Sequence, residues 1–542
     1  MRLSTPMAAT AAMVVSVLAS YLFPQTFASG TLTKLLSLFI TCHFFFISLD
    51  KLIIYPFFID PLRHLPQAPG FRPLVGHEFT LFKRPLGEPH LKIMKEVDND
   101  GLILTRGFFH SNKVIVTSTA ALADILVHKS YDMEKPPPVR TFLRKFLGDG
   151  LLMTEGDEHK HHRKNIMPAF HFRHIKELYP IFWSKSIEFC NAMGRAIQDN
   201  DDRVLEIGHY ATQVTLDIIG LAGLGRDINS LRNSDDELIK IYEELLEPST
   251  EKGIYFLLHL LFPVWIIEML PWKLNGRVKF MTTELKRTCT EFVGQKKANA
   301  KLESKESLDI LSIMLRSNNF SDSNLVDQLL TFLAAGHETT SSALTWSGYL
   351  LSTHPDVKAK LRNEIYKHIP DPQALSDPAM DVAGLLEGMP YLNAVCNEVL
   401  RVYPTVPITA RYAVRDTNIA GQYIPKGTVL FIPPWAINRN PKLWGPDSEK
   451  FVPERWIDEN GRTTMNGGAD SNYAFLTFLH GPRACIGERF ARAELRALVV
   501  ALVGSFDFQM AYPDEKVIAA GTITSKPLNG MRLKLQPLNW GE

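Results

Sequence analysis

Residues 478–487, with the sequence FLHGPRACIG, place a single cysteine among glycines at fixed spacings. The cysteine, Cys485, could supply a thiolate, and a thiolate is an electron-rich axial ligand for haem iron. Gly481 and Gly487 would allow backbone N–H groups to approach the sulfur and tune it, because they carry no side chain. The competing interpretation is an ordinary buried cysteine in a turn rich in glycine and proline.

The residues around this cysteine favour the haem interpretation. Phe478 could cover the sulfur with an apolar ring, and Arg483 could bind a haem propionate through a charge-assisted hydrogen bond. The sequence after Gly487, ERFARAELRALVVALVGSF, has the composition and period of a helix. The N-terminus of that helix would lie near the thiolate, where the positive end of the helix dipole stabilises an anion.

A second unusual segment lies in a long helix predicted over residues 321–352, whose middle reads AGHETT. A glycine in mid-helix costs about 1 kcal/mol relative to alanine, and such a local violation often marks a functional site. Ala335 and Gly336 would leave room for O2 and a flat macrocycle. Glu338 and Thr339 would form an acid–alcohol pair that relays protons. The alternative is a helix loosened for packing.

With these motifs the chain resembles the cytochrome P-450 family of haem-thiolate monooxygenases, over nearly all of the sequence after the N-terminal apolar stretch. The resemblance implies a mainly α fold with small β-sheets, haem b bound through Cys485, and O2 as co-substrate. It also implies electrons from NADPH through a separate NADPH–cytochrome reductase. No segment has the strand–GxGxxG–helix context of a fused nucleotide-binding domain.

Further haem and partner residues follow from the resemblance. His159 and Arg163 lie four residues apart, on one face of a helix. The family usually has tryptophan and arginine here, both holding a propionate, and a histidine N–H can serve the same role. Lys160 and Lys164 make this helix a candidate docking patch for the acidic reductase, because opposite charges accelerate encounter. An ordinary solvated face is the alternative.

A structural ion network is implied around Glu398 and Arg401, three residues apart in an apolar helix. The later segment PERW supplies Arg455, and the three residues resemble the Glu/Arg/Arg triad that fixes the family's fold around the haem. Trp456 stands where phenylalanine is frequent. Arg411 is a candidate propionate ligand.

Substrate contacts are implied by the family's pocket. The candidates are Val406, Ile408 and Thr409, where the family's backbone passes over the haem, and Thr522 and Ile523 in a hairpin tip at residues 521–525. Residues 131–150 are predicted as a long loop that covers the pocket. Its cations, Arg140, Arg144 and Lys145, would suit a carboxylate-bearing substrate; a solvated charged loop is the alternative.

Residues 1–60 are predicted as a membrane anchor and residues 61–542 as the haem-binding monooxygenase domain. The apolar run Met7–Phe23 is long enough to span a bilayer, although a cleaved signal peptide would also begin with an apolar run. A second run, Leu35–Leu49, is short for a clean span and suits a second, re-entrant or interfacial helix. The resemblance implies the endoplasmic reticulum membrane, with the catalytic domain facing the cytosol.

The totals agree with this assignment. The chain has 542 residues, 45% hydrophobic and 22% charged, with a formal net charge of +1, so nothing in the totals suggests a nucleic-acid partner. Five scattered cysteines are odd in number, which excludes a complete disulfide framework and suits a reducing compartment.

The sequence therefore predicts an enzyme that inserts one oxygen atom of O2 into a lipophilic small molecule. Its likeness is to fungal-type microsomal members, many of which oxidise terpenoid or polyketide metabolites. Three alternatives stay open: a fatty-acid hydroxylase of the same family, an O2-independent haem-thiolate isomerase or dehydratase, and a non-catalytic haem sensor or electron carrier. The intact Glu338–Thr339 pair argues against the last two.

Overall fold

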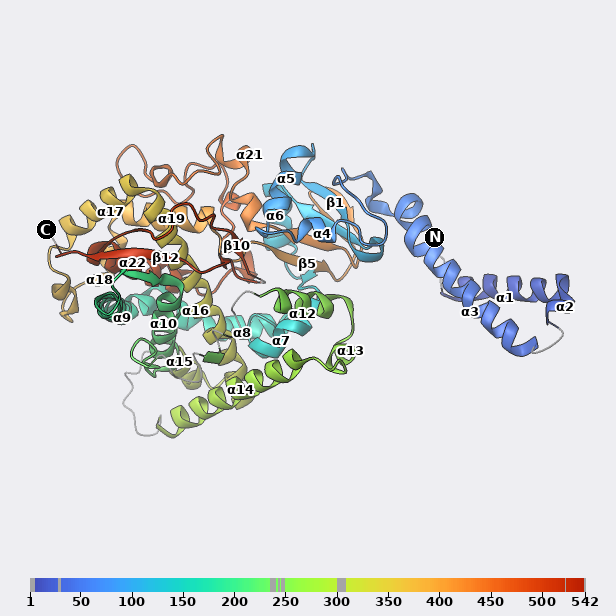
Figure 1. Ribbon diagram of the computed structural model, residues 1–542, viewed down its shortest axis with the longest axis horizontal. Helices are drawn as coiled ribbons and strands as arrows, with labels where there is room; N and C mark the ends of the chain where they lie inside the picture. Colours follow the sequence, from blue (N-terminus) through green and yellow to red (C-terminus); the bar gives the residue numbers. More distant parts are fainter. Residues whose placement is uncertain are drawn as a thin grey trace.

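The computed structural model describes residues 5–27, 31–233, 240–241, 244, 249–299, 309–521 and 523–540. Helices predominate in these residues, and the strands form four small sheets. Figure 1 shows a broad body with the N-terminal helices projecting from one end. The predicted mainly α fold with small β-sheets is confirmed.

The projecting part consists of apolar helices that lie side by side. α1 (Thr5–Leu22) lies along α3 (Thr31–Leu49), and the short α2 (Pro24–Phe27) follows α1. α3 continues into a π-helical segment, η1 (Asp50–Ile59). Among the described residues, Leu32–Ile59 is the one helix long and apolar enough to cross a membrane, and Met7–Leu22 is shorter. The sequence predicted the first apolar run as the one long enough to span a bilayer and the second as short. In the structure the second helix is the longer one, because apolar residues after Lys51 extend it.

A five-stranded sheet lies at the end of the body nearest these helices (Figure 1). Its strands, in spatial order, are β1 (Leu102–Arg106), β2 (Asn112–Val116), β8 (Val429–Ile432), β5 (Thr409–Ala413) and β3 (Met133–Glu134). The sequence of residues 102–117, LILTRGFFHSNKVIVT, has the pattern of two strands joined by a turn at residues 110–112, and β1 and β2 form this hairpin. β2 pairs in parallel with β8. This sheet brings the segment around Arg411 next to residues far away in the sequence.

The other sheets are smaller. They consist of β4 (Val204–Glu206), β12 (Arg532–Pro537) and β9 (Phe506–Met510); of β6 (Thr417–Ile419) and β7 (Gln422–Ile424); and of β10 (Ala519–Ala520) and β11 (Lys526–Pro527). The β10–β11 hairpin lies against the central helix and carries the predicted pocket tip.

The central helix is α16 (Asp322–Thr353), most of which is buried. Ser321 caps it through a capping box with Asn324, which confirms the predicted start. The helices packed against it include α10 (Ile207–Ile219), α14 (Lys273–Asn299), α19 (Pro390–Val402) and α22 (Glu488–Ser505). The helix that carries the AGHETT segment is therefore surrounded by helices, and its buried residues before and after the segment, such as Leu333 and Ala343, belong to the main hydrophobic core.

Further helices complete the body. They are α4 (Glu78–Leu81), α5 (Glu88–Glu96), α6 (Thr119–Ala123), α8 (Gly156–Ile166), α9 (Phe172–Gln198), α12 (Thr250–Leu261), α13 (Val264–Glu268), α15 (Ile310–Ser317), α17 (Pro355–His368), α18 (Val382–Glu387), α20 (Pro434–Ile437) and α21 (Pro441–Trp444).

The segment predicted as one long loop, residues 131–150, is a strand followed by a helix. β3 is followed by α7 (Pro137–Leu147), whose first residues are prolines. Proline is favoured in the first turn of a helix, where its missing N–H costs nothing. Phe142 is buried on one side of α7 and stacks edge-on with Phe256 at 4.9 Å. The loop prediction was wrong because it took the prolines as helix breakers rather than as a helix start.

Candidate active site

The loop that carries Cys485 is held in place by backbone contacts. The Cys485 N–H donates to the Phe478 carbonyl oxygen at 2.9 Å, closing the turn around Gly481–Arg483. Gly481 has a φ of +77°, and a Cβ there would lie 2.1 Å from the carbonyl oxygen of Leu126. Both features require glycine at this position.

The surroundings of the thiol keep it protonated. The Cys485 side chain is accessible although it lies deep within the protein. Burial raises the pKa of this thiol to about 11, while the N–H of Gly487 and the charge of Arg163 act to lower it. A Cβ at Gly487 would lie 3.9 Å from the sulfur, at ordinary contact distance. A thiolate at neutral pH therefore needs a cation bound to the sulfur.

Three cations gather around one carboxylate next to this loop. This cationic cluster consists of Lys135, Arg411 and Arg483, with Glu155 as the carboxylate. Arg483 forms an ion pair with Glu155, and the Lys135 Nζ lies 3.6 Å from the same carboxylate. Among the described residues, Nε and Nη2 of Arg483 are buried without a hydrogen-bond partner.

The charges of the cluster are poorly balanced. Burial, with the nearby charge of Arg483, lowers the pKa of Arg411 to about 10, and burial lowers that of Lys135 to about 8. Unbalanced buried cations are costly unless an anion pairs with them. The guanidinium nitrogens of Arg483 that lack a hydrogen-bond partner, together with the excess positive charge, fit a group that carries two carboxylates, as haem does.

His159 and Arg163 lie on α8 but contact different partners. The Arg163 Nη1 donates to the Ala484 carbonyl oxygen at 2.7 Å, so this guanidinium orients the cysteine loop. The His159 Nδ1 lies 3.3 Å from the Tyr131 hydroxyl. Burial, together with Arg483, lowers the pKa of His159 to about 4, so the ring is neutral at pH 7 and can offer an N–H but not a charge.

Sequence reasoning missed Tyr131, Lys135 and Glu155. None of them lies in a recognisable motif. The pairing of β3 with β5 brings Tyr131 and Lys135, which flank β3, to the strand that carries Arg411. Glu155 is the residue before α8, and its position beside a basic helix was the one available signal.

The predicted residues of α16 divide between two sides of the helix. Ala335 is exposed and Thr339 is half-buried in an otherwise buried helix, and the Thr339 hydroxyl donates to the Ala335 carbonyl oxygen at 2.8 Å. A Cβ at Gly336 would lie 2.9 Å from the Ile219 side chain of α10. Gly336 therefore permits close packing of α16 against α10, and the role of Ala335 and Gly336 in leaving room for O2 stays a prediction.

Glu338 contacts the C-terminal hairpin and is 2% exposed. Its carboxylate accepts a hydrogen bond from the Thr524 hydroxyl at 2.7 Å and lies 2.9 Å from the Lys526 Nζ. These two partners were not predicted. The predicted acid and alcohol are neighbours in sequence, but their side chains have different partners.

The three residues of the predicted triad lie in one buried network. Glu398 accepts hydrogen bonds from Arg401 at 2.7 and 2.8 Å and from the Arg455 Nε at 3.0 Å. The Trp456 indole N–H also donates to it, at 2.9 Å. A phenylalanine could not supply that bond, which explains the tryptophan. The fully paired network joins α19 to the PERW segment.

The other predicted side chains are placed as follows. The Phe478 ring is partly buried, with the Arg492 guanidinium 4.9 Å from its centre. Val406, Ile408 and Thr409 are half-buried, and Ile523 is exposed. Thr522 lies outside the described residues. Lys160 and Lys164 are both exposed on α8, and Lys160 pairs with Asp157 at 2.7 Å.

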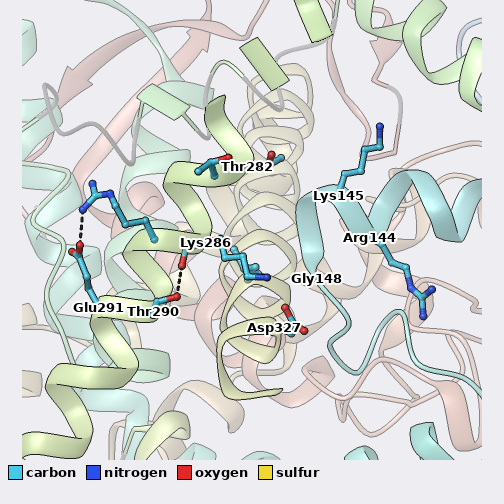
Figure 2. A pocket seen from close by; sticks show the side chains of 11 residues that line it. Arg144, Lys145, Gly148, Thr282, Lys286, Thr290, Glu291 and Asp327 are labelled. Atoms are coloured by element: carbon cyan, nitrogen blue, oxygen red, sulfur yellow. Dashed lines mark hydrogen bonds and ion pairs between the residues drawn. The ribbon is translucent and has the colours of Figure 1, made fainter. Parts of the chain in front are cut away.

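Two of the three predicted pocket cations, Arg144 and Lys145, line a surface cleft of about 680 Å³ between α7, α14 and α16 (Figure 2). Cys485 is not among the residues that line it. Arg144 pairs with Asp149, and Lys145 lies 3.0 Å from a Glu268 oxygen. Arg140, on the same helix, lies 3.5 Å from Glu134. Each predicted cation thus has a carboxylate near it, while the Nε of Arg140 is buried without a hydrogen-bond partner among the described residues, so a carboxylate-bearing substrate stays an open alternative.

Three features together are typical of a haem-thiolate protein. They are a cysteine loop that directly precedes a helix, buried cations suited to two carboxylates, and a helix that carries an acid and an alcohol. The chain belongs to the cytochrome P-450 family, whose model matches residues 66–531. It is an oxidoreductase of the class that incorporates oxygen from O2, and the family implies haem as its cofactor.

Fungal members of the family are similar over nearly the whole chain. The cytochrome P-450 monooxygenase sphH of Aspergillus fumigatus is 42% identical over 503 residues, covering 90% of this chain and 91% of that protein. The monooxygenase ptmK of Penicillium ochrochloron is 36% identical, covering 90% of this chain and 96% of that protein. The monooxygenase abl5 of Leptosphaeria maculans is also 36% identical, covering 90% of each chain.

Proposed function

We propose that this enzyme inserts one oxygen atom of O2 into a lipophilic terpenoid or polyketide, with electrons from NADPH through a separate reductase. The observation that carries the proposal is the accessible Cys485 thiol next to a cationic cluster with too few carboxylates. The fungal relatives support a monooxygenase of this family. The substrate class rests on the resemblance to fungal-type microsomal members.

Haem would be held by Cys485 at its iron and by Arg411 and Arg483 at its propionates. When bound, haem supplies the reduction of O2 and the oxidation of the substrate. Arg163 holds the cysteine loop in position through its hydrogen bond to the Ala484 carbonyl oxygen, and Gly487 donates its N–H to the sulfur. His159 acts through Tyr131, orienting it beside the Arg483 guanidinium, which lies 5.0 Å from the centre of its ring.

Thr339 and Glu338 would deliver protons. The Thr339 hydroxyl is on the accessible side of α16 and is fixed by the Ala335 carbonyl, so it can pass a proton while keeping its orientation. Glu338, the preceding residue, is buried, and its carboxylate contacts the Thr524 hydroxyl and the Lys526 ammonium; it would be the acid of the pair.

The enzyme would act at the membrane surface of the endoplasmic reticulum, facing the cytosol. The apolar helix Leu32–Ile59 supports an anchor. Trp265 and Met269, 63% and 75% exposed at α13, add an apolar surface suited to lipid. The exposed Lys160 and Lys164 on α8 would attract the acidic reductase.

The test uses membranes that contain the full chain with NADPH–cytochrome reductase. Farnesol, geranylgeraniol and lauric acid serve as probes under ¹⁸O2. We expect one ¹⁸O atom in the product from a terpenoid probe, dependence on the reductase and a thiolate-type CO-difference band. Turnover without reductase or O2 would overturn the proposal, and oxidation of lauric acid alone would replace it with fatty-acid hydroxylation.

A further inference from the structure

Glu155 joins three separate segments of the chain. It is the residue before α8, yet within the described residues its side chain caps no N–H group of that helix. Its carboxylate instead accepts a hydrogen bond from the Lys135 backbone N–H at 2.9 Å, lies 3.6 Å from the Lys135 Nζ and forms an ion pair with Arg483. The start of α8, the residue after β3 and the cysteine loop therefore meet at this one side chain.

The Glu155 carboxylate is a buried anion. Its side chain is 4% exposed. Burial acts to raise the pKa of this carboxyl, but the nearby charge of Lys135 and the hydrogen bond from the Lys135 N–H outweigh burial and hold the pKa below 4.5. The side chain is therefore ionised at pH 7, and both of its oxygens face a cation.

The ion pair with Glu155 leaves one edge of the Arg483 guanidinium open. Arg483 uses Nη1 for Glu155, and its Nε and Nη2 are buried without a hydrogen-bond partner among the described residues. Nε and Nη2 lie on one edge of the guanidinium, and such an edge can bind a carboxylate through two parallel hydrogen bonds. Glu155 thus holds Arg483 in an orientation in which it can bind a second carboxylate.

The charges of the cationic cluster match those of haem only when Glu155 is counted. Lys135, Arg411 and Arg483 carry three positive charges at pH 7 against the one negative charge of Glu155, and His159 is neutral. The net charge of these groups is therefore +2, equal and opposite to that of the two haem propionates. With haem bound, every buried charge of the set would be matched.

We propose that Glu155 is a positioning residue that presents the Nε–Nη2 edge of Arg483 to a haem propionate and lowers the reduction potential of the haem iron. The inference rests on the haem site of the proposed function and extends that function to the uptake of the first electron. Reduction adds one negative charge to the haem, and a buried carboxylate nearby disfavours that charge. Lys135 has the opposite effect, so the two side chains offset each other at the iron.

Three variants and a matched control test this role in the purified, full-length, haem-loaded protein at pH 7. Glu155→Gln removes the negative charge, Lys135→Met removes the positive one, and the double variant removes both. Glu78→Gln is the control, because Glu78 is also 4% exposed and pairs with a lysine, Lys113, that is 19% exposed against 17% for Lys135. The first readout is the midpoint potential of the haem, from titration with dithionite in the presence of mediators. The second is the rate of haem transfer to excess apomyoglobin.

We expect Glu155→Gln to raise the ratio of ferrous to ferric haem at a fixed potential by a factor of about three or more, which is a positive shift of about 28 mV at about 59 mV per tenfold. Lys135→Met should shift the potential in the negative direction by a similar amount. The double variant and Glu78→Gln should stay within about 1.5-fold of the wild-type ratio, because neither changes the net charge of the cluster. Haem transfer should be about threefold faster or more in Glu155→Gln than in Glu78→Gln, because Arg483 is no longer held.

A wild-type potential in Glu155→Gln would overturn the inference, and so would haem transfer no faster than in Glu78→Gln. If Glu155→Gln retains no haem, the double variant decides. Recovery of haem with a potential near that of the wild type supports the charge balance, and continued loss of haem overturns it. Failure of the proposed function looks different, because the wild type would then oxidise none of the probes while the potentials would still report the effect of Glu155.

Discussion

At the scale of single residues, Glu494 shows the cost of burying a carboxyl group. It lies on α22, is fully buried, and faces the Thr340 hydroxyl without a hydrogen bond of normal geometry among the described residues. Burial raises its pKa well above 4.5. A raised pKa means that the folded state binds the proton more tightly than the unfolded state does. The contribution of Glu494 to the free energy of unfolding is therefore fully present below pH 4.5 and is lost as the pH rises above that value.

Glu494→Gln should therefore remove a pH-dependent penalty. We expect the variant to match the wild type near pH 4.5 and to gain about 1–3 kcal/mol of unfolding free energy at pH 8, because a neutral amide of the same size replaces a group that must ionise or stay protonated. Chemical unfolding of the haem-loaded protein at both pH values measures this. A gain of equal size at both pH values would contradict the explanation.

At the scale of elements, the cysteine loop meets the π-helical segment η4 (Asp124–His128), which is far away in the sequence, through backbone contacts. Gly481 and Gly461 have similar φ angles of +77° and +73°, but a Cβ at Gly461 would meet nothing within 4 Å. Gly461→Ala should thus cost only the left-handed backbone penalty of roughly 1–2 kcal/mol and retain haem. Gly481→Ala must also displace Leu126, and we expect it to lose the CO-difference band of the thiolate form.

The two glycine variants share one measurement, the haem content and CO spectrum per folded protein. A Gly481→Ala protein with a normal thiolate band would show that the close approach to Leu126 is not needed for the site.

The sequence predicts elements well where local pattern and chemistry agree. The cysteine loop, the start of α16 at its capping box and the β1–β2 hairpin carry their own signals. Lys135 and Lys526 could not be predicted, because each acts through a contact between segments far apart in the chain. The packing role of Gly336 was missed for the same reason, since only the position of Ile219 on α10 reveals it.

At the scale of the whole molecule, the N-terminal part is attached to the body through polar contacts. Arg106 on β1 donates to the Pro56 carbonyl oxygen at 2.8 Å and forms an ion pair with Asp60, and the His110 ring lies 2.6 Å from the Leu52 carbonyl oxygen. A boundary between anchor and body at residue 60 would cut through these contacts. The apolar helix Leu32–Ile59 and the body of the protein are therefore mechanically connected.

Two truncations separate anchoring from stability. Removal of residues 1–30 deletes α1 and keeps Leu32–Ile59, so we expect the protein to stay in the membrane pellet after alkaline carbonate and to keep its Tm. Removal of residues 1–60 should release it into the carbonate supernatant and lower the Tm by several degrees, because Arg106 loses its buried carboxylate partner. Arg106→Lys in the full chain, which should lower the Tm while leaving the protein in the pellet, separates the two effects. Release of the shorter truncation by carbonate would assign the anchor to α1 instead.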